Sequence, residues 1–215
     1  MKKHYLFTLI FFLICLLSFA QQVVIDGQTY KTVKIGSQTW MAENLNVTKF
    51  RNGEDIPLAL VEEEWWMGGE DGIPAYVDVE FDSENGQFFG KLYNYFAVSD
   101  PRGIAPEGWR VPTDADWAAL AASLGGPEVA TAKLKSSEGW LEENGTNESG
   151  FTAFPVGSID ADGYFLDQGF FGFFWSSTEN DGFVLNRSLS ENKYPFEAAE
   201  SFKSNGFSLR LIKVE

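Results

Sequence analysis

Cysteine and histidine are almost absent from the sequence, which contains one of each, Cys15 and His4. Both lie within the first 20 residues, so the rest of the chain has no thiol nucleophile and no Ser-His-Asp triad. It also lacks the usual ligands for zinc, copper or non-haem iron, and it cannot form a disulfide bond. Three classes of function remain possible: catalysis by carboxylates, calcium binding through oxygen ligands, and ligand binding without catalysis.

Basic residues are also scarce. The chain has 16 lysine and arginine residues against 31 acidic residues, so its net charge is −15, and loss of Lys2 and Lys3 would make it −17. Such a charge repels nucleic acid and anionic membranes, and no basic stripe in the sequence offsets it. We therefore expect neither of them among the partners of this protein.

Long hydrophobic runs are absent beyond the N-terminus. Lys2 and Lys3 precede an apolar run over residues 5–17, and a Ser-Phe-Ala segment with small residues follows. This pattern is typical of a secretory signal peptide, and the run is shorter than the ~20 residues that cross a bilayer. We expect residues 1–20 to be a signal peptide and residues 21–215 to form one domain, exported to the periplasm, the cell surface or the extracellular space.

The start of that domain has the pattern of a small β-meander. Asp26-Gly27 is a two-residue hairpin turn, and Gly36-Ser37 marks a second turn. The expected strands cover residues 23–25, 28–35 and 38–41. From Arg51 to Gly86 the pattern becomes irregular, rich in acids, glycine and aromatic residues, and we expect a long loop there.

The clearest helix begins after Pro112, because Thr113 can cap it and Asp114 and Asp116 fall in its first turn. Its apolar face and its end follow at helical spacing, as Trp117, Leu120, Ala121, Leu124 and then Gly125-Gly126. We expect a second helix over residues 127–135 and a short helical turn over residues 94–99.

After Gly150 the chain consists of short apolar segments bounded by glycine, asparagine or aspartate. These favour strands, which we expect over residues 151–155, 172–176, 182–186 and 207–212. The sequence therefore predicts one α+β domain in which strands dominate, with two main helices.

Several of these segments together resemble one protein family. The segments are Tyr30 to Leu45, Gly90 to Tyr95, Pro106 to Trp117, Leu134 to Ser136, Asn147 to Phe151, Phe174 to Glu179 and Gly206 to Arg210. Their order and spacing are similar to those of the Fibrobacter succinogenes major paralogous domain family, found in exported proteins of Bacteroidetes and Fibrobacteres. The resemblance implies a C-type-lectin-like fold, related to that of formylglycine-generating enzymes, with paired termini, a twisted antiparallel sheet, two main helices and long ligand-facing loops.

The sequence departs from this family at three positions. Relatives often carry cysteine where this chain has Ala105 and Leu211, and histidine where it has Arg110. A disulfide bond contributes about 2–4 kcal/mol, so the resemblance implies that this chain depends more on its core than such relatives do.

Acidic residues provide three candidate sites, each with a structural alternative. Asp160-x-Asp162-Gly163 resembles the start of a calcium loop, but the expected downstream glutamate is missing because residue 171 is Phe. We therefore favour a solvated turn and assign no firm metal or cofactor. Capping explains Asp114 and Asp116, and Glu43 in the family motif resembles an acid that ties strand ends together.

The segments 62–82 and 160–171 are the most promising ligand-facing loops. Among their aromatic residues we single out five that could stack on a sugar or anchor a protein partner: Trp65, Trp66, Tyr164, Phe170 and Phe171. The alternative is that these rings fill the undersides of their own loops.

We expect a non-enzymatic, exported binding domain that recognises a glycan or an extracellular protein, and we assign no catalytic residue. One alternative is an enzyme of the glycosidase type, which needs two carboxyl groups facing each other across a cleft. Another is a structural cell-surface protein that packs mainly with its neighbours.

Overall fold

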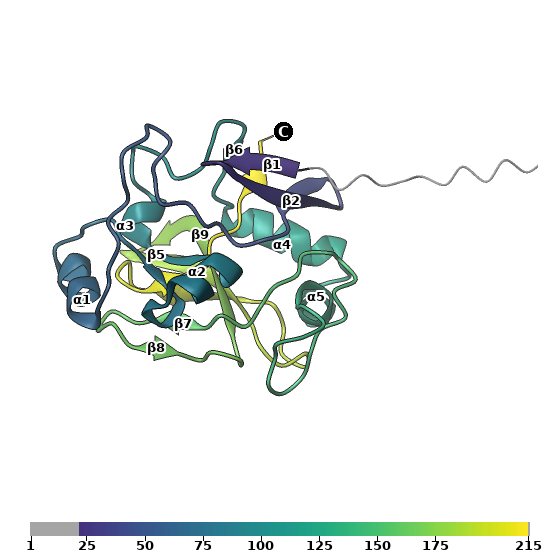
Figure 1. Ribbon diagram of the computed structural model, residues 1–215. Helices are drawn as coiled ribbons and strands as arrows, with labels where there is room; N and C mark the ends of the chain where they lie inside the picture. Colours follow the sequence, from purple (N-terminus) through teal and green to yellow (C-terminus); the bar gives the residue numbers. More distant parts are fainter. Residues whose placement is uncertain (1–21, 215) are drawn as a thin grey trace, which may run out of the picture.

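A computed structural model describes residues 22–214, so the expected signal peptide lies outside the described residues. The chain opens with the predicted meander, β1 (Gln22–Ile25), β2 (Gln28–Ile35) and β3 (Gln38–Met41) (Figure 1). Asp26 and Gly27 both have positive φ, at 48° and 75°, as a tight hairpin turn between right-twisted strands requires. Strands β13 (Ile212–Lys213) and β6 (Trp109–Arg110) extend this sheet in the order β1-β2-β3-β13-β6, so strands from both ends of the domain share one sheet, although β13 pairs with β3 rather than with β1.

The remaining strands form two further sheets. One has the order β4-β5-β12-β7-β8, and the other has the order β11-β10-β9. Every pairing between these strands is antiparallel. The architecture is therefore mostly antiparallel sheet with a few helices, as in an α+β domain, but it divides into three sheets rather than one. The strands are β4 (Tyr76–Asp78), β5 (Lys91–Asn94), β7 (Ser158–Ile159), β8 (Phe165–Leu166), β9 (Gly172–Asn180), β10 (Phe183–Leu189), β11 (Ala198–Ser201) and β12 (Gly206–Phe207).

The two expected main helices are present as α4 (Asp114–Ser123) and α5 (Pro127–Leu134), and the short turn is α3 (Tyr95–Val98). Thr113 and Asp116 form a reciprocal capping box at the start of α4. Asp114 does not cap the helix, since its carboxylate pairs with Arg187 at 2.6 Å. The Glu43 carboxylate accepts a hydrogen bond from the backbone N–H of Lys31, which ties β2 to the segment after β3.

The expected long loop over residues 51–86 was wrong, because it contains α1 (Glu62–Glu70), η1 (Val79–Phe81) and the first part of α2 (Ser83–Phe89). Three glutamates in the first turn of α1 favour a helix start, and its packing against the core outweighs the weak helix propensity of Gly68 and Gly69. In α2, Gly86 is required because a Cβ atom there would overlap the Asp78 carboxylate.

Two expected strands were also wrong. Residues 151–155 form only one isolated bridge, and residues 207–212 are split between β12 and β13. The buried side chain of Arg210 bears on the first of these, since its guanidinium donates to the carbonyl oxygens of Phe151 and Thr152 at 2.6 and 3.0 Å. Between β12 and β13 the backbone carbonyl oxygens accept in turn from Trp175, Leu45 and Met41, so this segment follows no single partner strand.

The core is rich in large rings, as the aromatic content predicted. Trp40 and Trp117 lie 4.5 Å apart between ring centroids, and both are fully buried. Ala105 and Leu211, where relatives often have cysteine, are buried in one hydrophobic cluster that supports the N-terminal sheet. Within residues 22–214 no helix has the length and apolar character needed to cross a membrane.

Candidate functional site

The predicted ligand-facing residues divide into buried and exposed groups. Trp65 is buried, and its indole N–H donates to the Asp160 carbonyl oxygen at 2.9 Å, so its ring is not available to a ligand. This corrects the expectation for Trp65, which instead anchors α1 to the turn at residues 160–163. Trp66 is 45% exposed and Tyr164 is 56% exposed.

Asp160 organises the turn that was considered for calcium. Its Oδ1 atom accepts hydrogen bonds from the backbone N–H groups of Asp162 and Tyr164, at 3.0 and 2.9 Å. An aspartate that accepts hydrogen bonds from the backbone that follows it forms an Asx turn, and this turn explains why the Asp160-x-Asp162-Gly163 motif occurs here. Within residues 22–214 no three His, Cys, Asp or Glu side chains gather as a metal site would require.

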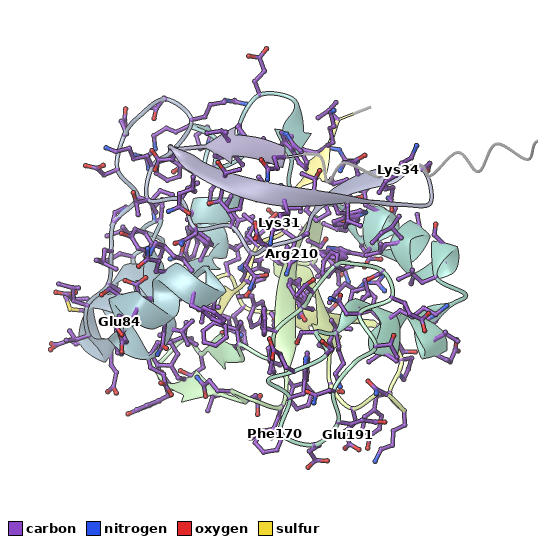
Figure 2. The ribbon with its side chains drawn as sticks, turned by 45° about the vertical axis from the view of Figure 1, so that its right-hand side comes forward. Lys31, Lys34, Glu84, Phe170, Glu191 and Arg210 are labelled. Atoms are coloured by element: carbon purple, nitrogen blue, oxygen red, sulfur yellow. The ribbon has the colours of Figure 1, made fainter. Side chains whose placement is uncertain are left out.

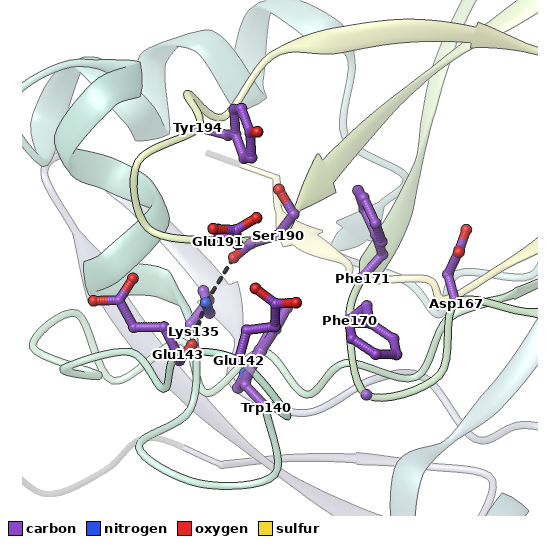
Figure 3. Close-up of a pocket in the computed structure, with 11 residues that line it drawn as sticks. Lys135, Trp140, Glu142, Glu143, Asp167, Phe170, Phe171, Ser190, Glu191 and Tyr194 are labelled. Carbon is purple, nitrogen blue, oxygen red and sulfur yellow. Dashed lines mark hydrogen bonds between the residues drawn. The ribbon is translucent and has the colours of Figure 1, made fainter.

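Phe170 and Phe171 border a hollow at the edge of the domain (Figure 3). Phe170 is 44% exposed, whereas Phe171 is half-buried and stacks on Phe173 with ring centroids 5.4 Å apart. The hollow has a volume of about 310 Å³ and lies among three segments, residues 138–143, 167–171 and 190–194, which we call the three-loop pocket. Its lining residues are Lys135, Trp140, Glu142, Glu143, Asp167, Gly169, Phe170, Phe171, Ser190, Glu191 and Tyr194.

Hydrogen bonds to backbone carbonyl oxygens hold the three loops together. The N–H of Leu141 donates to the Gly169 carbonyl at 2.9 Å, which joins the first loop to the second. The Asn192 side chain donates to the Asn144 carbonyl at 3.0 Å, which joins the third loop to the end of the first. Asp167 has a φ of 65°, and its carbonyl accepts from the N–H groups of both Phe170 and Phe171. The aromatic rings of the second loop are therefore presented on a tight, hydrogen-bonded turn.

Lys135 forms the floor of the three-loop pocket. It follows α5 and is fully buried, and its ammonium donates to the carbonyl oxygens of Glu143 and Ser190 at 2.5 and 2.6 Å (Figure 3). The same ammonium lies 4.2 Å from the centroid of the Trp140 ring. Burial lowers the pKa of Lys135, while the nearby charges of Glu143 and Glu191 act in the opposite direction. This lysine connects the first and third loops from below.

Acidic residues from all three loops line this pocket. The pocket lining includes four carboxylates, from Glu142, Glu143, Asp167 and Glu191. Glu191 pairs with Lys193 at 2.6 Å, and the Lys193 ammonium lies 5.0 Å from the ring centroid of Tyr194. Figure 2 shows Glu191 and Phe170 near each other at the edge of the molecule, whereas Arg210 lies at its centre.

A second hollow adjoins the three-loop pocket. It has a volume of about 470 Å³ and shares Gly169 with the first. Its apolar wall consists of Phe88, Phe89 and Phe154, whose ring centroids lie 4.7 to 5.8 Å apart. The loop at residues 168–169 therefore separates two neighbouring hollows, each lined by aromatic and acidic residues.

Sequence reasoning found Phe170 and Phe171 but missed most of the pocket. The sequence offered one indication for Lys135, its place in the family-like segment from Leu134 to Ser136. No pattern in the neighbouring residues predicted that it would form the floor of a pocket. Trp140 and Tyr194 were not distinguished from core rings. The carboxylates of the rim come from loops that are far apart in sequence, so no spacing motif connects them.

Comparison with family models gives a match over residues 33–213, to a family described as the Fibrobacter succinogenes major domain. The matched range includes every residue that lines the three-loop pocket. Searches of curated proteins and of solved structures gave no match.

Proposed function

The chain belongs to the Fibrobacter succinogenes major domain family, and from that premise we propose that it is an exported, non-enzymatic binding domain. Its scaffold is of the C-type-lectin-like kind, and its loops hold a glycan or an extracellular protein in the three-loop pocket. The export signal is the N-terminal segment, with its two lysines and apolar run.

The observation that carries this proposal is the pair of exposed rings on opposite loops of one hollow. Phe170 is 44% exposed and Tyr194 is 50% exposed, and both line the pocket of about 310 Å³. Large rings that remain open to water around a concave site are typical of binding surfaces, because a ligand that covers them gains much apolar contact area. Carboxylates beside them supply acceptors for ligand hydroxyl, amide or ammonium groups.

Glycan arrays and pull-downs of extracellular proteins, with the purified domain, test this proposal. We expect a ligand whose binding is weakened at least tenfold by Phe170→Ala, the loss that follows when one central anchor ring is truncated. Trp66→Ala is the matched control, because Trp66 is 45% exposed but lies on α1 rather than in the pocket. Binding no stronger than that of an unrelated acidic protein, or equal losses in the two variants, would contradict the proposal.

A glycosidase is the second candidate, favoured by carboxylates from different loops around one hollow. Glu142 comes from the first loop and Glu191 from the third, and both line the three-loop pocket. Retaining and inverting enzymes place their two carboxyl groups ~5–9.5 Å apart. Turnover of chromogenic glycosides that disappears in Glu142→Gln would replace the binding proposal with this one.

A further inference from the structure

We propose that the three-loop pocket selects a primary ammonium group, the side chain of a lysine on an extracellular protein partner. This inference rests on the proposed function and specifies its ligand. Three features of the pocket carry it: its excess of negative charge, its aromatic rings, and the placement of one of the chain's own lysines.

The charges that line the pocket do not balance. Four acidic residues, Glu142, Glu143, Asp167 and Glu191, and one basic residue, Lys135, line the pocket, and Lys193 at its rim pairs with Glu191. The ammonium of Lys135 is already engaged by two carbonyl oxygens and the Trp140 ring. The pocket therefore retains acceptors for a positive charge, and the net charge of −15 on the whole chain attracts cationic partners toward it.

Aromatic rings occupy the same lining as these carboxylates. Trp140, Phe170, Phe171 and Tyr194 all line the hollow, and in Figure 3 the two phenylalanines stand on the side opposite Lys135 and Glu143. The face of an aromatic ring attracts an ammonium within about 6 Å of its centroid, and more strongly where water is excluded. Carboxylates and ring faces together favour a cation over a neutral sugar of the same size.

Lys193 of this chain already illustrates the geometry that a ligand would adopt. Its ammonium lies 2.6 Å from a carboxylate oxygen of Glu191 and 5.0 Å from the Tyr194 ring centroid. Glu191, with a smaller effect from Glu142, raises the pKa of Lys193, so both carboxylates act on a cation at this place. The Lys193 side chain is 64% exposed, so it lies at the rim, where a lysine of a partner can displace it.

A lysine of a protein fits these features better than an amino sugar. The ammonium that the rim already holds stands on a flexible four-carbon stem, which can reach between the loops while the partner backbone stays outside. The apolar stem of such a side chain packs against ring edges as its charged end reaches the carboxylates.

Fluorescence polarisation with a dye-labelled Gly-Ser peptide that carries one central lysine tests the inference. The same peptide with an Nε-acetylated lysine is the control for charge, and a glucosamine oligomer is the control for ligand class. We expect saturable binding of the lysine peptide at low ionic strength and at least fivefold weaker binding of the acetylated peptide.

Three variants place the binding in the pocket. Glu191→Gln should weaken the lysine peptide about fivefold, and Lys193→Ala should tighten it about two- to threefold because it frees Glu191. Glu84→Gln, on α2, removes the same charge outside the pocket lining and should change affinity less than about 1.5-fold.

Equal affinity for the lysine and acetyl-lysine peptides would overturn the inference, and so would equal effects of Glu191→Gln and Glu84→Gln. Tighter binding of the glucosamine oligomer than of the lysine peptide would overturn the assignment to a protein partner. A neutral glycan that requires Phe170 would leave the proposed function intact while contradicting the ammonium ligand.

Discussion

The centre of the molecule and the three-loop pocket both contain a buried cation held by carbonyl oxygens and an aromatic ring. Arg210 at the centre donates to the carbonyls of Met41, Phe151 and Thr152 and to Asn44 Oδ1, and its guanidinium lies 4.3 Å from the Phe151 ring centroid. Lys135 at the pocket has two carbonyl acceptors and the Trp140 ring at 4.2 Å.

The surroundings of the two cations differ. Arg210 joins three chain segments inside the core, and burial lowers the pKa of its guanidinium. Lys135 joins two loops beneath a hollow that carries carboxylates and exposed rings. A buried cation bound to carbonyl oxygens thus stabilises the core at the centre and the loops of the pocket at the edge. Substitutions at the centre should therefore affect mainly the stability, and substitutions at the pocket should affect mainly ligand binding.

Replacement of Arg210 should have the largest effect on stability. Arg210→Met leaves four buried acceptors without a donor, and we expect a loss of about 3–5 kcal/mol in the free energy of unfolding. Urea denaturation followed by tryptophan fluorescence measures it. A loss below about 1 kcal/mol would show that Arg210 does not organise the core.

Replacement of Lys135 should cost less, because the carbonyls it releases lie beside a hollow that water can enter. For Lys135→Met we expect a loss of about 2 kcal/mol, with faster amide hydrogen exchange in residues 138–144 and 190–194. Unchanged exchange in both loops would contradict the assignment of Lys135 as their common support. Arg210→Met serves as the comparison, since it should affect the centre more than these loops.

Low pH should remove a smaller contribution to the free energy of unfolding, which comes from the Asp116 carboxylate at the start of α4. Burial opposes ionisation of Asp116, but hydrogen bonds from Arg110 and Thr113 outweigh it and lower its pKa to about 2. Because the folded-state pKa lies below the unfolded value, this stabilisation is fully present above about pH 4 and is lost as the pH falls toward 2.

Arg110 is partly open to solvent, so screening limits the effect to about 1 kcal/mol. Urea midpoints measured between pH 5 and pH 2 should fall less in Asp116→Asn than in the wild type. Parallel pH profiles for the two proteins would rule out this contribution.

Truncation of Phe170 should have the smallest effect on stability. The ring is half-exposed at the pocket, so Phe170→Ala should cost less than about 1 kcal/mol while it abolishes most ligand binding. Thermal unfolding beside the binding assay measures both. A loss comparable to that of Lys135→Met would mean that the ring supports the loop rather than a ligand.

Local patterns predicted the parts of the fold that local interactions determine. The meander follows from the Asp26-Gly27 turn, and α4 follows from the cap at Thr113, because each depends on residues close in sequence. Helix α1 was missed because Gly68 and Gly69 weaken its signal and Trp65 supplies the packing. The sequence also did not distinguish Trp65 from Trp66, whose side chains leave a helix about 100° apart.

The pocket was harder to predict because its parts meet only in the folded chain. Glu142, Phe170 and Glu191 come from three loops that no single motif covers, and Lys135 comes from the end of α5. The two phenylalanines were identified because they lie in a predicted ligand-facing loop. The acidic residues and Lys135 could not be identified in this way, because only long-range contacts bring them to the pocket. The burial of Arg210 could not be predicted from the sequence either. The residue lies in one of the family-like segments, but no local pattern indicates what its side chain does.

Chemical-shift mapping of the isotope-labelled domain during titration with the single-lysine peptide tests the central claim most directly. The account predicts that the largest shifts fall in residues 138–143, 167–171 and 190–194, including the Trp140 indole, while the amides around Arg210 remain unchanged. Shifts concentrated around Arg210, in the β1–β3 sheet or along α1, with the three loops unaffected, would contradict it.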